Sequence, residues 1–144
     1  MRPTCTRRIQ FCSGHRVQEQ GDKNRNLHGH NYVAFLDAEA EDLDDLGREP
    51  DFSAIKERVG GWIDENWDHG FIIGEDDTEG RRALAAMPTA KVYVLPMSPT
   101  AEWMADYILY DIAPKVLAGT NVRVRKVVLW ETENYYATAE LGAR

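Results

Sequence analysis

The chain is expected to fold as an α+β domain, with two main helices on one face of an antiparallel four-stranded sheet. Residues 4–15 and 28–41 alternate between two faces with the period of two that is typical of strands. Residues 51–66 carry mostly apolar side chains at the 3.6-residue spacing of a helix. Two further strand-like runs, 122–132 and 135–141, close the chain. The order β-β-α-(β)-α-β-β predicts helices packed on one face of an antiparallel sheet.

The first two strands are expected to pair with each other. Residues 16–27 between them are polar, contain a glycine and lack periodicity, so they form a loop. Antiparallel pairing of the flanking strands would bring the end of the first next to the start of the second. His15, His28 and His30 would therefore lie together at one end of the ladder.

The first helix has a capping residue in Asp51 or Ser53, and Gly70 suits its exit. Residues 74–90 are acidic and irregular, with a helical turn expected around 81–87, and residues 91–95 read as a short strand.

The second helix is expected to begin with Ser98 as its N-cap and Pro99 in its first turn. Apolar residues then recur to Ile112, and Pro114 predicts a kink or a break.

Composition limits the class of protein. The 144 residues, 43% of them hydrophobic, suffice for one compact domain spanning 1–144, and no apolar run approaches the length of a membrane span. The basic N-terminus lacks the apolar stretch of a secretory signal. Cys5 and Cys12 fall on opposite faces of one strand, which indicates free thiols and a cytoplasmic location. A net charge of −7 argues against a nucleic-acid partner but allows a small anionic ligand in a locally basic pocket.

Three histidines form the clearest candidate site. His28 and His30 project to the same side of an extended chain, and His15 ends the preceding strand. Neutral imidazole is the commonest metal ligand. Three histidines without a fourth protein ligand leave one position of a zinc ion open to water or substrate. The alternative is a surface strand that carries two histidines by chance.

Three further residues could take part in chemistry. Asp68 could influence the tautomer of His69, although adjacent residues rarely bond each other directly, so we expect it to act through the backbone or another residue. His69 could equally be a cation at a helix C-terminus. Glu131 ends an apolar strand, where a carboxylate needs a partner unless the strand end is exposed. An N–C–N edge of a heterocycle would offer it two parallel N–H donors.

Six motifs occur together in order along nearly the whole chain. They are Phe11-Cys12-Ser13-Gly14-His15-Arg16, Leu27-His28-Gly29-His30-Asn31-Tyr32, Asp51-Phe52, Trp67-Asp68-His69-Gly70-Phe71, Pro99-Thr100-Ala101-Glu102 and Trp130-Glu131-Thr132. Through them the sequence resembles the 6-pyruvoyl-tetrahydropterin synthase and 6-carboxy-tetrahydropterin synthase family. The resemblance implies the tunnelling fold, in which trimers close a barrel from four-stranded sheets and two trimers stack into a homohexamer.

The resemblance also implies a site and a substrate. It implies Zn²⁺ held by His15, His28 and His30, and a pterin ring anchored by Glu131. Thr100 and Glu102 match the second pterin-contacting stretch of the family, and Asp68-His69 match its proton-relay pair. The implied substrate is 7,8-dihydroneopterin triphosphate, from which queuosine-type deazapurine, tetrahydropterin and folate pathways branch. The implied activity is a lyase reaction.

One position departs from the family. Its catalytic cysteine lies four residues before the first histidine of His-Gly-His in the carboxy branch, where this chain has Asn24. An amide cannot act as a thiolate base. Cys12 is not expected to replace it, because strand parity turns it away from His15. Glu19 and Asp22 could serve instead, in an aldolase-type enzyme that cleaves the pterin side chain, and a third alternative is a pterin-binding protein without catalysis.

Overall fold

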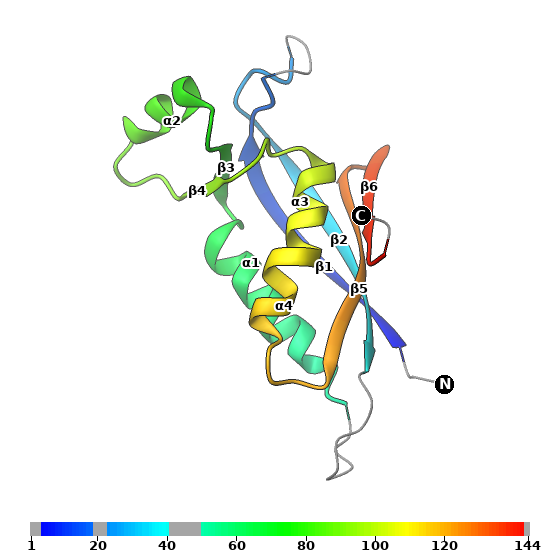
Figure 1. Cartoon of the computed structure of the whole chain (residues 1–144). Coiled ribbons are helices and arrows are strands. Elements are labelled where there is room, and N and C mark those ends of the chain that lie inside the picture. The colour runs from blue at the N-terminus through cyan, green and yellow to red at the C-terminus, as the bar shows by residue number, and fades with distance from the viewer. Residues whose placement is uncertain (1–3, 19–22, 41–49, 143–144) are drawn as a thin grey trace.

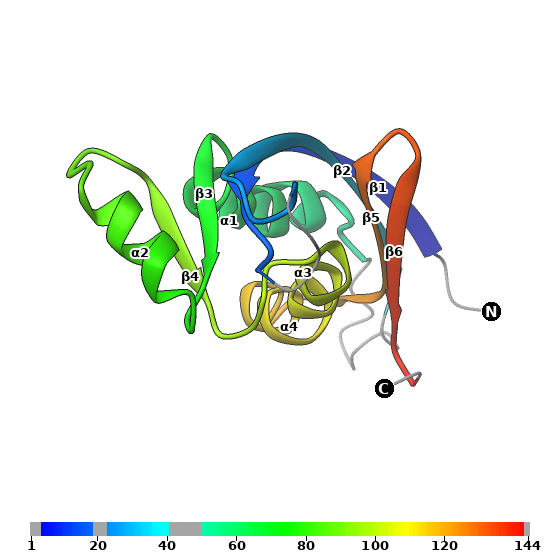
Figure 2. The same ribbon diagram turned by 90° about the horizontal axis from the view of Figure 1, so that it is seen from above.

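A computed structural model describes residues 4–18, 23–40 and 50–142 of the chain. Its centre is a six-stranded sheet in the order β4-β3-β1-β2-β5-β6. Two long helical segments cover one face of this sheet (Figure 1), and the sheet curves around them when seen from above (Figure 2). Among the described residues, no helix combines the length and apolarity needed to cross a lipid bilayer.

The four expected antiparallel strands are present. They are β1 (Thr4–His15), β2 (His28–Ala40), β5 (Val122–Thr132) and β6 (Tyr135–Glu140). β1 pairs with β2 over its full length, and β5 pairs with β2 and β6. Their alternating burial follows the polar–apolar alternation of the sequence, which is why these strands were predictable.

The sheet has two strands more than the four expected, because two short strands extend it beyond β1. One of them confirms the short strand expected at 91–95, whereas the other, at 70–74, was not expected. β3 (Gly70–Gly74) pairs in parallel with β1, and β4 (Val92–Leu95) pairs in parallel with β3. Four of the five residues of β3 are buried, so it lacks the alternation that marks a strand with one face in water. Its pairing partner, not its own pattern, makes this segment a strand.

The first helix runs through a π-helical segment, η1 (Ile55–Gly60), into α1 (Gly61–Asn66). Of the two expected capping residues, Asp51 accepts hydrogen bonds from the backbone N–H and the hydroxyl of Ser53, whereas the Ser53 hydroxyl donates to Asp51 and does not act as a cap. Ile55, Val59 and Ile63 form the buried stripe that packs on the sheet.

The acidic segment before β4 is more helical than expected. α2 (Thr78–Ala85) is an eight-residue helix, which starts earlier than the expected turn at 81–87 because Asp77 caps it. The Asp77 carboxylate accepts the Gly80 N–H at 2.9 Å and is itself buried.

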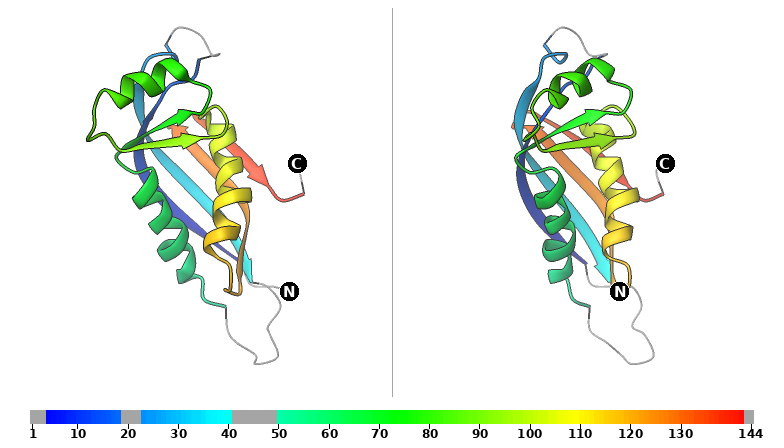
Figure 3. Two further views of the ribbon diagram at one scale, coloured as in Figure 1. Left: turned by 60° about the vertical axis from the view of Figure 1, so that its left-hand side comes forward. Right: turned by 90° about the vertical axis from the view of Figure 1, so that its left-hand side faces the viewer.

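The second long helix joins α3 (Ala101–Tyr107), η2 (Ile108–Ile112) and α4 (Ala113–Val116). Its N-cap is Thr100, not Ser98 as expected, since the Thr100 hydroxyl accepts the Trp103 N–H at 3.2 Å. Pro114 lies in the first turn of α4, directly after the π-helical η2, so the helical segment changes type near the proline and does not end before it. The two long helices lie side by side on the sheet (Figure 3).

Candidate metal and substrate site

The three histidines come together where β1 ends and β2 begins. His15 pairs with His28 across the ladder, and His30 lies opposite Ser13. Ring centroids are 4.7 Å apart for His15 and His28, 5.0 Å for His15 and His30, and 4.9 Å for His28 and His30. One ring nitrogen from each lies within 4.8 Å of the other two. Antiparallel register and strand parity are sufficient to produce this cluster.

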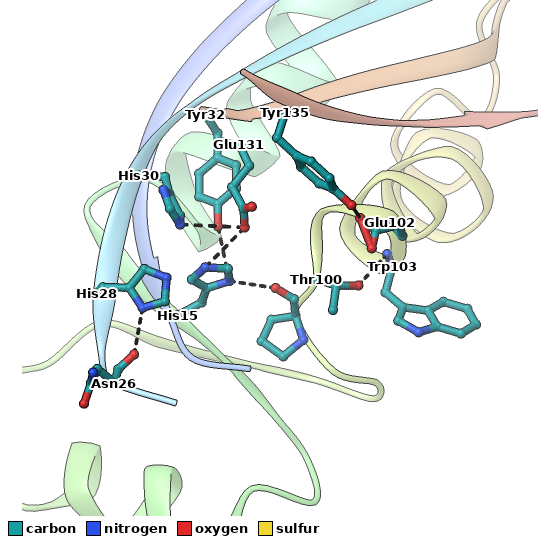
Figure 4. A network of polar contacts seen from close by, with 11 residues as sticks. His15, Asn26, His28, His30, Tyr32, Thr100, Glu102, Trp103, Glu131 and Tyr135 are labelled. Carbon is teal, nitrogen blue, oxygen red and sulfur yellow. Dashed lines mark hydrogen bonds and ion pairs between the residues drawn. The ribbon is translucent and has the colours of Figure 1, made fainter. Parts of the chain in front are cut away.

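Backbone carbonyls set the tautomers of two of these rings (Figure 4). The Nδ1 of His15 lies 2.7 Å from the Pro99 carbonyl oxygen, and the Nδ1 of His28 lies 2.7 Å from the Asn26 carbonyl oxygen. A carbonyl can only accept, so each Nδ1 carries the proton. The Nε2 atoms of both rings are therefore left with lone pairs, which is the arrangement found in metal-ligating histidines.

Burial keeps His15 neutral. Its side chain is 1% exposed, and desolvation lowers its pKa from 6.5 to about 4, with the neighbouring histidines acting in the same direction against the Pro99 hydrogen bond. Burial also lowers the pKa of His30, with His28 contributing. The buried Nε2 of His15 has no hydrogen-bond partner among the described residues. Such an atom costs free energy unless something outside the chain binds it.

Glu131 faces the same point from the end of β5. Its Oε1 lies 3.4 Å from the Nε2 of His15 and 3.7 Å from the Nε2 of His30. Burial, and then the negative charge of Glu102, raise the pKa of Glu131. A lone pair that faces a carboxylate is repulsive unless a cation or a proton lies between them. The donor set and the orphaned nitrogen of His15 therefore fit a metal ion.

Tyr32 packs next to His15. It is fully buried, and its hydroxyl lies 3.3 Å from the Nδ1 of His15. Its ring stacks on Phe11 at 5.0 Å, and Phe11 packs against Trp67 at 5.8 Å. Burial, and then the charge of Glu131, hold the pKa of Tyr32 well above 10, so its hydroxyl stays protonated. Sequence analysis gave Tyr32 no role, although its two-residue spacing from His30 places it on the same face.

Thr100 and Glu102 lie at the start of α3, beside the Pro99 carbonyl that holds His15 (Figure 4). Thr100 caps the helix, and Glu102 accepts a hydrogen bond of 2.6 Å from the Tyr135 hydroxyl. Tyr135, which sequence analysis missed, ties the first turn of α3 to β6. The structure thus brings both expected substrate-contacting residues to the side of the site that holds Glu131.

Asp68 and His69 bond each other directly, contrary to expectation. The Oδ2 of Asp68 lies 2.7 Å from the Nδ1 of His69. His69 adopts a left-handed backbone conformation with φ 59°, which turns its ring back toward the preceding carboxylate. Burial would raise the pKa of Asp68, but hydrogen bonds from the Cys12 backbone and His69, and the charges of His69 and Lys91, lower it overall. Asp68 is thus ionised and orients the imidazole.

The loop before His28 holds the remaining candidate. Asn24 is half-buried, and its backbone carbonyl oxygen accepts a hydrogen bond from the Val17 backbone N–H at 2.7 Å. The alternative carboxylates, Glu19 and Asp22, lie outside the described residues.

Comparisons with known proteins agree with this architecture. The 6-pyruvoyl tetrahydropterin synthase family profile matches residues 4–141. The chain is 39% identical over 132 residues to the 6-carboxy-5,6,7,8-tetrahydropterin synthase of Rickettsia conorii, covering 92% of this chain and 96% of that one. It is 34% identical over 146 residues to the protein of the same name from Aquifex aeolicus, covering 86% and 89%.

Solved structures show the same fold. A Wolinella succinogenes protein described as uncharacterized superposes with a TM-score of 0.79 at 22% identity, covering 98% of this chain and 99% of its own. The 6-pyruvoyl tetrahydropterin synthase of Caenorhabditis elegans superposes with a TM-score of 0.63 at 22% identity, covering 97% of this chain and 96% of its own. The expected tunnelling fold is confirmed, with two strands more than the four expected. The chain is an enzyme of the 6-pyruvoyl tetrahydropterin synthase family.

Proposed function

We propose that the chain is a zinc-dependent lyase that acts on 7,8-dihydroneopterin triphosphate or a closely related pterin, in the manner of a 6-carboxytetrahydropterin synthase. One observation carries the proposal: ring nitrogens of His15, His28 and His30 converge where the half-buried carboxylate of Glu131 also points. The names of the Rickettsia and Aquifex relatives support the carboxy type.

Zinc suits this donor set. Three neutral imidazoles are a ligand set of catalytic zinc sites, in which the fourth position stays open. The backbone carbonyls of Pro99 and Asn26 would hold two of the rings in the ligating tautomer. When bound, zinc would supply Lewis acidity to oxygen atoms of the pterin side chain.

Glu131 would anchor the pterin ring. Its carboxylate is partly desolvated, which raises its pKa, so it gains from a partner that offers N–H donors. The N–C–N edge of a pterin presents two parallel donors, which suit a bidentate carboxylate. Thr100 and Glu102 would contact the ligand from the start of α3.

Asp68 and His69 would move protons. With the Nδ1 proton of His69 directed at Asp68, the Nε2 of the ring is free to accept a proton and later return it. Asn24 has no proton to exchange near neutral pH, so it would leave this role to other groups.

A homohexamer of two stacked trimers would complete the enzyme. Tyr135 and Tyr136 on the edge strand β6 are large and half-exposed in the single chain, as expected of a surface that another subunit covers. Light scattering of the purified protein would test this assembly.

Turnover by zinc-loaded protein tests the proposed activity. Incubation with 7,8-dihydroneopterin triphosphate should release triphosphate and acetaldehyde, and His28→Ala should lose both zinc and activity. Glycolaldehyde instead would indicate the aldolase-type alternative with Glu19 or Asp22. Tight binding without turnover would indicate a pterin-binding protein.

A further inference from the structure

A second cluster of chemically active side chains lies near the first. The thiol of Cys12, a carboxylate oxygen of Asp68 and a ring nitrogen of His69 lie within 4.8 Å of one another. Strand parity turns Cys12 away from His15, as expected, but it turns the thiol toward the Asp68–His69 pair. Sequence reasoning excluded Cys12 because it considered only the strand on which Cys12 lies.

The backbone fixes this cluster. The Cys12 N–H donates to the Oδ1 of Asp68 at 3.0 Å, and the His69 N–H donates to the Cys12 carbonyl at 2.7 Å. These bonds hold the turn after α1 against β1, with His69 in its left-handed conformation. A non-glycine residue at positive φ carries a free-energy cost, and such residues concentrate at functional sites.

The hydrogen bonds favour proton transfer over metal binding. One oxygen of Asp68 accepts from the Cys12 backbone and the other faces the Nδ1 of His69, so the carboxylate is already engaged at both ends. It can therefore orient the imidazole, and a ring nitrogen of His69 lies within 4.8 Å of the thiol. This is the order of roles in a thiol–imidazole–carboxylate set.

A hollow beside the thiol–imidazole pair extends to two of the three clustered histidines. A cavity of about 510 Å³ is lined by Cys12 and His69 and also by His28 and His30. Gly14 and Gly29, paired across the ladder, lie on its floor and have no side chains to divide it. A small molecule in this hollow could meet the thiol–imidazole pair while lying beside His28 and His30, although His15 and Glu131 are not part of its lining.

We infer that Cys12 supplies the thiol that position 24 lacks, as a catalytic acid/base paired with His69 and oriented by Asp68. The thiol proton passes to the ring nitrogen of His69, and the sulfur keeps the electron pair. The thiolate then takes a proton from a carbon of the pterin side chain: the C–H bond breaks, an S–H bond forms, and the carbon's electron pair stays with the substrate. This inference rests on the proposed function.

Thiol reactivity tests the pair without any substrate. Cys5 is a free, half-buried thiol on the same strand and serves as the reference within each protein. Burial and the charge of Asp37 raise the pKa of Cys5, so the loss of the Cys12 advantage in the variants is the decisive result. Iodoacetamide should alkylate Cys12 at pH 7 roughly tenfold faster than Cys5, and the advantage should vanish in His69→Asn and Asp68→Asn. Asparagine tolerates the left-handed backbone at position 69, so the fold should survive. Equal rates for Cys12 and Cys5, or no effect of either variant, would overturn the inference.

Turnover of Cys12→Ser tests the role in catalysis. We expect turnover to fall roughly 100-fold or more, the range of general acid–base contributions, with zinc content and pterin affinity unchanged. Cys5→Ser should keep full turnover. An active Cys12→Ser enzyme would refute the inference and leave the proposed function standing. A reactive Cys12 in a protein without turnover would refute the proposed function and the catalytic role of Cys12, and would leave only the thiol–imidazole pairing. A second zinc per chain that Cys12→Ser removes would show a metal site and overturn the proton-transfer role.

Discussion

The buried His15 should make the metal-free protein sensitive to mild acid. Its pKa is about 4 in the folded chain and about 6.5 in an unfolded one. Because the folded pKa is the lower, the unfolded state binds more protons between these values, so stability is greatest above pH 6.5 and falls as pH drops toward 4. Integration from pH 7.5 to 5 gives a loss of about 2 kcal/mol from this group alone.

Replacement of the ring isolates this contribution. His30 acts in the same direction as His15, whereas the raised pKa of Glu131 acts in the opposite direction. Both groups are present in wild type and in His15→Gln, so their effects largely cancel when the two proteins are compared. The variant should be less stable at neutral pH but should lose about 2 kcal/mol less than wild type on acidification.

Urea unfolding of EDTA-treated protein at pH 7.5 and pH 5 provides the measurement. Both proteins should be studied at one protein concentration, because any oligomer couples stability to concentration. An NMR titration of the His15 ring would give its folded pKa independently. Equal acid sensitivity of wild type and His15→Gln, or a His15 pKa near 6.5, would refute the reasoning.

Three further substitutions test contacts that hold the elements around the site in place, and each is measured by chemical denaturation. Asp77→Ala should destabilise the protein by about 3 kcal/mol, because buried Asp77 accepts two hydrogen bonds from Arg16, at 2.6 and 2.8 Å, and caps α2. Gly14→Ala should cost about 1–3 kcal/mol, since a Cβ there would lie 2.5 Å from the Phe71 ring. Thr100→Ala should cost about 1 kcal/mol by removing the N-cap of α3.

Two control substitutions change an exposed side chain and a glycine that has free space around it. Glu79→Ala removes a largely exposed carboxylate 3.6 Å from Arg16 and should change stability by less than about 0.5 kcal/mol. Gly61→Ala adds a methyl group where nothing lies within 4 Å and should be neutral or slightly stabilising. If Asp77→Ala or Gly14→Ala were as mild as its control, the corresponding contact would not support the site.

Local pattern was enough to predict the long strands and the histidine cluster. Period-two alternation identifies β1 and β2, and the polar loop between them permits only an antiparallel return. That register alone places His15 opposite His28. The amphipathic spacing from Ile55 to Ile63 identifies the first helix in the same way. These features depend on residues close together in the chain.

Tertiary structure decided what depends on distant partners. β3 is a strand because β1 lies beside it, and the pattern of a fully buried segment carries no periodicity. His15 owes its ligating tautomer to Pro99, 84 residues away. Cys12 meets Asp68, 56 residues away, only because the turn after α1 folds back onto β1. The sequence by itself determined which side chains could bind a metal, whereas packing across the sheet decided their proton positions and their partners.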